Sequence, residues 1–339
     1  MNMDLRIGVI GCGAIGTKHM QRINDRIDGA KVVAVNDIKP ERAAAAAKLT
    51  GAKIFDDGNE LVTSPDVDAI VVTTNDPAHK GYVLKAIAAK KYVFCEKPLA
   101  LGGPDCMEIV NAEVDYGQRL VQVGFMRHFD RGYEEIKAEL DKGYLGEPLM
   151  VHCTHRNEEV DESYDTPMAV ENTAVHEIDI LRWLLGENFV STEVILPRKQ
   201  TSLTHANLHD PQFIILETES GINVDIEVFV NCQFGYDINC KVVCEKGQAA
   251  LTSPTFSSIK YQEKDYTHIP AEWEERFIKA YDREFQLWVK AVKADHLTGP
   301  SAWDGYMASV TTGMCSKARE SGKREKITFN EMPALYAQK

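Results

Sequence analysis

The 339-residue sequence has no long hydrophobic run, no dense basic stripe and no closely spaced pair of cysteines. No apolar stretch approaches the roughly 20 residues that a membrane-spanning helix needs. The 51 acidic residues outnumber the 38 basic ones, and the resulting net charge of −13 argues against nucleic acid as a partner. No signal-peptide pattern follows Met1, so we expect a cytoplasmic protein without membrane attachment.

Eight cysteines are scattered along the chain without a CxxC pair, and the closest two are Cys240 and Cys244. In a chain of this length the spacing predicts reduced, mostly buried thiols and no disulfide framework. His152, Cys153 and His155 form a cluster of potential metal ligands, but on a strand residue 152 points away from 153 and 155. Because two ligands do not make a closed site, we expect no metal.

Up to about residue 124 the sequence alternates between short apolar strands and helical segments. This alternation predicts βαβ units and a parallel sheet. Strands are expected at 6–11, 31–37, 68–74, 92–96 and 120–125, with helices beginning at 14 and covering 40–49, 78–90 and 105–116.

The pattern changes after residue 124, where several strands follow one another with few helices between them. Helices are expected at 130–141, 173–185, 273–294 and 301–321, and strands at 148–156, 190–196, 212–219, 222–231 and 236–245. The later strands are consistent with an antiparallel meander. The predicted fold class is therefore α/β, with a doubly wound domain at 1–124 and an α+β domain with an open, mostly antiparallel sheet at 125–339. The space between two such domains is the expected ligand site.

A glycine-rich segment, Gly11–Gly16 (GCGAIG), lies between the first strand and the first helix. In this context GxGxxG predicts a Rossmann loop, in which Gly11 permits a tight turn, Gly13 lets the backbone approach a pyrophosphate and Gly16 lets the helix pack on the strand. Asp37 ends the next strand, where an acid binds the adenosine ribose hydroxyls and repels a 2′-phosphate. The sequence therefore favours NAD over NADP.

Two residues in this sequence are suited to proton transfer or charge stabilisation. Lys97 follows the strand at 92–96, at the carboxyl end where ligands bind, and can donate to a substrate hydroxyl. The alternative for Lys97 is a surface ion pair with its neighbours. His176 lies near the start of the helix at 173–185, with Asn172 and Asp179 at helical spacing from it, and suits a general base. The alternative for His176 is a hydrogen-bonded structural histidine, with Asn172 or Thr173 as the N-cap of the helix.

The sequence resembles the Gfo/Idh/MocA oxidoreductase family, first of all in the segments GVIGCGAIG, VFCEKPL and HEIDILRW. The likeness extends over nearly the whole chain through the segments LVQVGFMRHFDRGY, GEPLMVHCTHRN, VNCQFGYDI, GPSAWDGY and VTTGMC. The resemblance implies NAD-dependent oxidation of a ring secondary alcohol of a cyclic polyol, with myo-inositol as substrate and 2-keto-myo-inositol as product. It also implies a cis Lys97–Pro98 bond and a homotetramer packed through the sheets of the second domain.

The same resemblance assigns site residues. Lys97 polarises the reacting hydroxyl and His176 takes its proton. Cofactor contacts are expected from Gly11, Gly13, Ala14, Ile15, Gly16, Asp37, Thr74, Asn75, His79, Glu96 and Lys97. Substrate contacts are expected from Lys97, Arg127, His155, Asn157, Asn172, Thr173, His176 and Tyr236. Other interpretations are an interface ion pair for Arg127, polar surface positions for His155 and Asn157, and sheet packing for Tyr236.

One residue departs from the family pattern, because Asn172 stands where the family has Asp. An amide orients an imidazole but offers no charge. We therefore hypothesise a lower pKa for His176 and weaker hydride transfer, unless Glu171 or Asp179 supplies a carboxylate. Three alternatives stay open: another inositol isomer as substrate, a pyranose or glycoside as substrate, and an NAD-binding protein in which catalysis is weakened or lost.

Overall fold

The computed structural model describes residues 4–200, 203–252 and 258–337, which form two compact units. The first unit comprises Met1–Met126, Tyr281–Ser309 and Asn330–Lys339, and the second comprises Arg127–Ala280 and Val310–Phe329. The predicted linear division at 124/125 therefore misses two C-terminal segments of the first unit. These segments belong to the first unit because they complete its hydrophobic core. The apolar side chains of Phe285, Trp288, Val289 and Val292 pack in the buried core that the first unit's strands form.

The first unit is built on a six-stranded parallel sheet in the order β3-β2-β1-β4-β5-β6. Its strands are β1 (Leu5–Ile10), β2 (Ala30–Asn36), β3 (Lys53–Ile54), β4 (Ala69–Val72), β5 (Tyr92–Glu96) and β6 (Val121–Gly124). All four residues of β4 are buried, as expected of a strand covered on both faces. The strand order reverses between β1 and β4, which confirms the predicted doubly wound fold. The two-residue β3 was not predicted.

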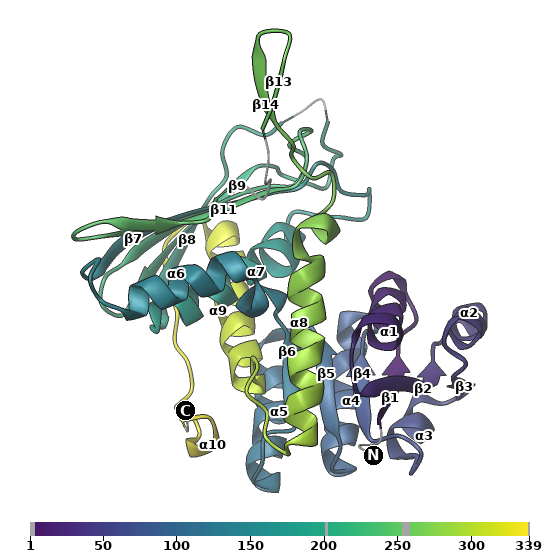
Figure 1. Ribbon diagram of the computed structural model, residues 1–339. Helices are drawn as coiled ribbons and strands as arrows, with labels where there is room; N and C mark the ends of the chain where they lie inside the picture. Colours follow the sequence, from purple (N-terminus) through teal and green to yellow (C-terminus); the bar gives the residue numbers. More distant parts are fainter. Residues whose placement is uncertain (1–3, 201–202, 253–257, 338–339) are drawn as a thin grey trace. The chain divides into compact units, whose positions relative to one another are not determined.

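Helices connect these strands: α1 (Ala14–Arg26), α2 (Pro40–Thr50), α3 (Gly58–Thr63), α4 (Asp76–Ala88) and α5 (Gly102–Tyr116) (Figure 1). Their ends follow local sequence signals. Pro40 occupies the first turn of α2, where its missing N–H costs nothing, and Gly51 ends that helix in a left-handed conformation. Gly117 ends α5 in the same way. The short helix α3 was not predicted.

The second unit contains a seven-stranded mixed sheet in the order β12-β11-β7-β10-β9-β8-β15. Its strands are β7 (Pro148–Arg156), β8 (Phe189–Ile195), β9 (Gln212–Thr218), β10 (Asn223–Phe229), β11 (Asp237–Cys244), β12 (Gln248–Ala250) and β15 (Glu325–Lys326). Only the β7–β10 pair is parallel, so the prediction of a mostly antiparallel sheet is confirmed.

The expected meander is interrupted, because β7 lies between β10 and β11. In β7 Val151, Cys153 and His155 are buried alternately with less buried neighbours, the pattern of a strand that covers a core with one face. Such a central strand needs partners on both edges, and β10 and β11 supply them. Local patterning does not encode which distant strand fills that place.

Three of the described helical elements belong wholly to the second unit: α6 (Arg131–Asp141), a π-helix (Ala169–Ala174) and α7 (Val175–Leu185). A 3₁₀ turn (Met126–Phe129) begins at the last residue of the first unit's N-terminal segment and continues into the second unit. Figure 1 shows α6 and α7 on one face of the sheet. Two helices, α8 (Trp273–Lys293) and α9 (Ala302–Ser321), begin in one unit and end in the other. A hairpin of β13 (Ser258–Tyr261) and β14 (Lys264–Thr267) and the terminal α10 (Ala334–Ala337) were not predicted.

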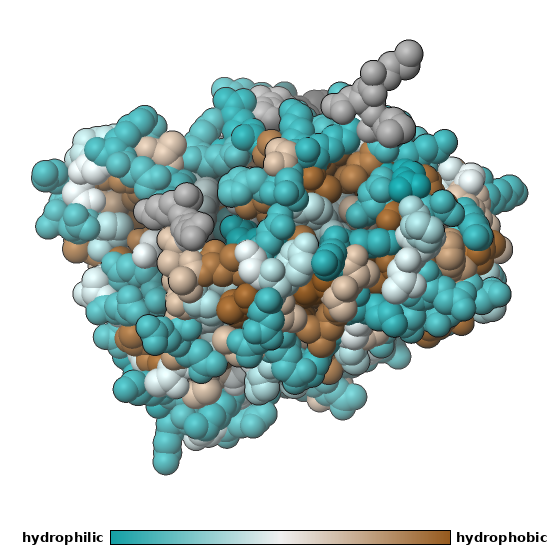
Figure 2. Space-filling model, turned by 90° about the horizontal axis from the view of Figure 1, so that it is seen from below, coloured by the Kyte–Doolittle hydropathy of each residue, from teal (hydrophilic) through white to brown (hydrophobic). Residues whose placement is uncertain are grey.

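All eight cysteines lie within the described ranges, and they are buried, free thiols. No helix in the described part of the chain combines the length and apolar character needed to cross a bilayer. The face shown in Figure 2 mixes hydrophilic residues with smaller apolar areas.

Candidate active site

The Gly11–Gly16 loop has the backbone that a dinucleotide loop requires. Gly11 adopts a φ of +95°, and a Cβ there would lie 2.5 Å from the carbonyl oxygen of Thr73. A Cβ on Gly16 would lie 2.1 Å from the carbonyl oxygen of Gly11, so only glycine lets α1 pack this closely on the turn. The Thr73 hydroxyl donates to the same Gly11 carbonyl at 2.7 Å, which holds the loop against the end of β4.

The space above Gly13 is open, since a Cβ there would meet only one atom, the Nη1 of Arg42 at 3.7 Å. Gly13 is the N-cap of α1 and carries no side chain that could occupy the first amide groups of the helix. Free N–H groups at a helix N-terminus bind phosphate well. Ala14 and Ile15 supply the first of these amides.

Asp37 lies directly beyond β2 and is fixed by the backbone. Its Oδ2 accepts the N–H of Cys12 at 2.7 Å, and its Oδ1 accepts the N–H of Lys39 at 2.8 Å. A carboxylate has about four lone-pair positions, so both oxygens keep capacity for ribose hydroxyls. Burial first, and Asp37 second, raise the pKa of the Cys12 thiol to about 12, which makes it an unreactive neighbour. These residues fit an NAD molecule.

His79 ties two loops of the first unit together. It is 1% exposed, and its ring nitrogens lie 2.7 Å from the Pro98 carbonyl oxygen and 3.1 Å from that of Thr74. Thr74 is half-buried and Asn75 is exposed, at the carboxyl end of β4. The predicted cofactor residue His79 therefore supports the backbone around the site, while Asn75 is open to a ligand.

Lys97 follows β5, and its bond to Pro98 is cis, as the sequence resemblance implied. Its backbone N–H donates to Glu96 Oε2 at 3.2 Å. Glu96 is buried, so it is not the exposed carboxylate that a surface ion pair with Lys97 would need. Burial disfavours the Glu96 carboxylate, but hydrogen bonding from His19 and the positive charge of Lys97 outweigh it, and the pKa of Glu96 is lowered.

In the second unit, His176 is the second residue of α7 and is buried. Asn172 lies in the preceding π-helix, so the predicted continuous helix from residue 173 is wrong for its first two positions. The change from π-helix to α-helix falls between Asn172 and His176, so their spacing of four does not belong to one regular α-helix. Single π-turns of this kind are frequent at functional sites.

His155 gathers several predicted substrate residues around it. Its Nδ1 lies 3.2 Å from Arg127 Nη2, and its Nε2 lies 3.4 Å from the Tyr236 hydroxyl. The ring centroids of His155 and His176 are 6.3 Å apart. The structure therefore brings Arg127, His155, His176 and Tyr236 together within one unit.

The centre of this cluster is a carboxylate that sequence reasoning missed. Glu177 Oε2 lies 2.9 Å from His155 Nδ1, and its Oε1 accepts from Arg127 Nη1. Glu177 and Arg127 are each about 1% exposed. Burial opposes both charges, yet their mutual attraction prevails, so the pKa of Arg127 is raised and that of Glu177 is lowered. The available signal was a charged residue among the apolar residues of α7, beside His176.

The remaining substrate candidates occupy different surroundings. The Thr173 hydroxyl is 2.5 Å from the Tyr164 hydroxyl. Asn157 lies just beyond β7, and both of its backbone polar groups are bonded, to Phe229 and Cys232. Its side-chain Oδ1 is buried and accepts no hydrogen bond from any described residue, so it is available to a ligand hydroxyl.

The two carboxylates considered as substitutes for the family's Asp are engaged by other side chains. Glu171 Oε1 accepts from the Ser316 hydroxyl at 2.8 Å. Asp179 Oδ2 lies 2.7 Å from His128 Nε2.

A parallel sheet with a glycine loop after β1 and an acid after β2 defines a dinucleotide-binding protein, and the buried histidines of the second unit add acid–base groups. Residues 5–125 match the oxidoreductase family described as "NAD-binding Rossmann fold", and residues 137–329 match its "C-terminal alpha/beta domain". The chain belongs to this family, Gfo/Idh/MocA, as the sequence resemblance implied.

Individual relatives match over nearly the full length. An inositol 2-dehydrogenase of Burkholderia lata is 52% identical over 336 residues, 98% of this chain and 99% of that one. An inositol 2-dehydrogenase of Klebsiella pneumoniae is 50% identical with the same coverage. The crystal structure of myo-inositol dehydrogenase from Lactobacillus casei, in complex with NAD(H) and myo-inositol, superposes with a TM-score of 0.96 at 36% identity, covering 98% of this chain and 100% of that one.

Proposed function

We propose that this protein oxidises a ring secondary alcohol of an inositol with NAD as the hydride acceptor, and that myo-inositol is converted to 2-keto-myo-inositol. The observation that carries the proposal is the 52% identity to an inositol 2-dehydrogenase over 98% of this chain. Lys97 and His176 both support it, since the chemistry needs one cationic donor and one proton acceptor.

In the proposed reaction Lys97 and His176 act on the same hydroxyl group of the substrate. The Lys97 ammonium donates a hydrogen bond to the substrate oxygen and stabilises the negative charge that develops there. The imidazole of His176 takes the hydroxyl proton. NAD, held by the Gly11–Gly16 loop and Asp37, would supply the acceptor for the hydride that leaves the carbon bearing this hydroxyl. The C–H and O–H bonds break, a C=O bond forms, and the products are a ketone and NADH.

The cluster around His155 supports recognition of a polyol. His155 and Tyr236 offer a ring nitrogen and a hydroxyl, and Asn157 offers its buried Oδ1. Arg127 contributes by holding His155, because its guanidinium is committed to Glu177. Thr173 and Asn172 complete the proposed contact set. A site that hydrogen-bonds several hydroxyls discriminates strongly among epimers.

Replacing Asp37 by Ser tests the proposed choice of NAD. The carboxylate repels a 2′-phosphate, so we expect Asp37→Ser to raise the ratio of kcat/KM for NADP to that for NAD at least about tenfold, equal to about 1.4 kcal/mol. Asp25→Ser, an exposed acid on α1, is the matched control and should leave the ratio unchanged. An unchanged ratio in Asp37→Ser would remove this residue from cofactor selection.

Replacing Asn172 by Asp tests the consequence of the family departure. A carboxylate near His176 would stabilise the imidazolium, so Asn172→Asp is expected to raise kcat about tenfold and to move the acid limb of its pH profile to higher pH. Steady-state rates between pH 6 and 10 measure both quantities. If neither changes, the amide at 172 already performs the positioning task and charge is not needed there.

The proposed function is tested by recording NADH absorbance after the protein is mixed with NAD and one substrate at a time. The panel contains myo-, scyllo- and chiro-inositol, glucose and a methyl glucoside. Turnover with an inositol and not with the sugars supports the proposal. Turnover with glucose or the glucoside alone replaces it with a sugar dehydrogenase. If no substrate of the panel is turned over while fluorescence shows that NAD binds, the result would favour an NAD-binding protein with lost catalysis. Asn172 is the observation that motivates this alternative.

We also propose a cytoplasmic homotetramer. The proposed self-association surface is the less buried face of the second unit's sheet, where side chains pair across strands, among them His152 with Asp225 and Arg156 with Glu227. The eight free thiols suit a reducing compartment. Light scattering after size-exclusion chromatography distinguishes four copies of the 37.9 kDa chain from two or one.

A further inference from the structure

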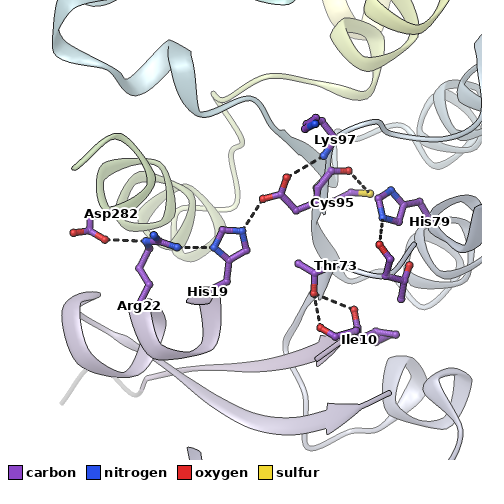
Figure 3. A network of polar contacts seen from close by, with 11 residues as sticks. Ile10, His19, Arg22, Thr73, His79, Cys95, Lys97 and Asp282 are labelled. Atoms are coloured by element: carbon purple, nitrogen blue, oxygen red, sulfur yellow. Dashed lines mark hydrogen bonds and ion pairs between the residues drawn. The ribbon is translucent and has the colours of Figure 1, made fainter. Parts of the chain in front are cut away.

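A line of buried polar contacts in the first unit runs from α8 to the backbone of Lys97 (Figure 3). Asp282 Oδ1 accepts from Arg22 Nε at 2.8 Å, and Arg22 Nη1 lies 2.6 Å from His19 Nδ1. The other ring nitrogen of His19, Nε2, lies 2.6 Å from Glu96 Oε1, and Glu96 Oε2 accepts the Lys97 N–H. None of these residues except Lys97 and Glu96 has a place in the proposed function.

The hydrogen-bonding inventory allows one arrangement of protons along this line. A guanidinium only donates, so Nδ1 of His19 must accept from Arg22. A neutral imidazole then carries its proton on Nε2 and donates it to the Glu96 carboxylate. The pKa of His19 is lowered, first by burial, which agrees with a neutral ring of this tautomer. The ring therefore accepts a hydrogen bond from Arg22 at Nδ1 and donates one to Glu96 from Nε2.

The surroundings of His19 leave it little freedom. The side chain is fully buried, and its ring packs at 4.6 Å between centroids on Phe285 and at 6.0 Å on Phe94. The titratable and charged groups that face it are Glu96 from β5, Tyr281 and Asp282 from α8, and Arg22 from its own helix. Gly124 on β6 leaves room for the carboxylate, since a Cβ there would lie 3.0 Å from Glu96 Oε2.

We propose that His19 is a positioning residue for Lys97: its single tautomer keeps the buried Glu96 carboxylate ionised and bonded to the Lys97 backbone, and this carboxylate in turn favours the ammonium form of Lys97. The inference rests on the proposed function only for the part that Lys97 plays in turnover. The link between His19, Glu96 and the charge of Lys97 belongs to the first unit alone and can be measured without substrate.

Three variants test the link. His19→Phe keeps a ring but removes both nitrogens, Glu96→Gln keeps the shape but removes the charge, and His19→Gln keeps one acceptor and one donor. The first readout is the titration of the Lys97 amine, followed by NMR of ¹³C-dimethylated lysines and assigned with Lys97→Arg. We expect the midpoint to fall in His19→Phe and Glu96→Gln and to stay near its original value in His19→Gln.

The second readout is turnover with the inositol that reacts. We expect His19→Phe and Glu96→Gln to lower kcat at least about tenfold and to move the alkaline limb of its pH profile to lower pH. The dissociation constant of NAD should stay within about twofold in His19→Phe, because His19 is not among the expected cofactor contacts. His19→Gln should restore most of kcat. If the Lys97 titration and kcat are unchanged in Glu96→Gln, the proposal is overturned even if His19→Phe fails to fold. A shifted titration in a protein that turns over no inositol would leave the link standing and refute the proposed function instead.

Discussion

Replacing Lys97 by Met is expected to lower kcat by about 10³-fold while the dissociation constant of NAD stays within about twofold. The loss is large because the ammonium acts on the oxygen where negative charge develops. Steady-state NADH absorbance gives kcat, and fluorescence titration gives NAD affinity. Lys85→Met, an exposed lysine on α4, is the matched control and should behave as the unaltered protein.

A different result would change the assignment. If Lys97→Met lost NAD binding and kept kcat at saturating NAD, Lys97 would be a cofactor anchor and not the donor to the substrate oxygen. Lys97→Arg separates charge from geometry, since the planar guanidinium keeps the charge but cannot occupy the same position. We expect it to recover only a small part of kcat.

Replacing Glu177 by Gln is expected to destabilise the second unit by about 3–5 kcal/mol, because it leaves the Arg127 guanidinium buried without a counter-charge. Urea unfolding followed by circular dichroism at pH 7 measures the change. The exposed pair Arg131–Glu135 supplies the control, since Glu135→Gln removes a surface ion pair worth about 0.3–0.5 kcal/mol.

The double variant Arg127→Met with Glu177→Leu separates the cost of an unpaired charge from the net value of the pair. Apolar replacement of both partners is often close to neutral, so we expect the double variant to be more stable than Glu177→Gln. If the double variant loses as much unfolding free energy as Glu177→Gln, the pair does more than neutralise two buried charges. It then also stabilises the unit through its contact with His155 or through the packing of α7.

The same carboxylate gives a pH dependence with a definite sign. The pKa of Glu177 is lowered in the folded protein, so its contribution to stability is present above the unfolded-state value of about 4.3 and is lost as pH falls through the folded-state pKa. The stability difference between the unaltered protein and Glu177→Gln should therefore shrink on acidification below about pH 4.

Local sequence patterns predicted the first unit well because its elements are coded locally. The strand Tyr92–Glu96 has the bounds that the sequence predicts, and the Gly11–Gly16 loop has the expected turn. In the second unit the strand Pro148–Arg156 also has its predicted bounds. The π-helix before His176 was missed because its sequence reads as the start of an α-helix. The insertion of β7 between β10 and β11 depends on pairing between residues far apart in the chain.

Motifs in the sequence point to Lys97 and His176 as candidate site residues, and their roles stay proposals. No motif marks the side-chain contacts in their neighbourhood: Glu177 contacts His155, 22 positions away in the chain, and His19 contacts Glu96, 77 positions away. No spacing rule within one helix or strand marks such partners, since they become neighbours only when separate elements pack together.

The division of the chain into units that interleave along the sequence has a consequence for how the protein is made. When a ribosome has released residues 1–126, the parallel sheet still lacks Phe285, Trp288 and the rest of the late segment 281–309 that completes its core. The nucleotide-binding unit therefore cannot complete its core until almost the whole chain has been synthesised, although domains near the N-terminus generally fold first. A gene fragment that ends at the motif boundary would encode an unfinished core, and transplanting this unit into another enzyme requires both ends of the gene.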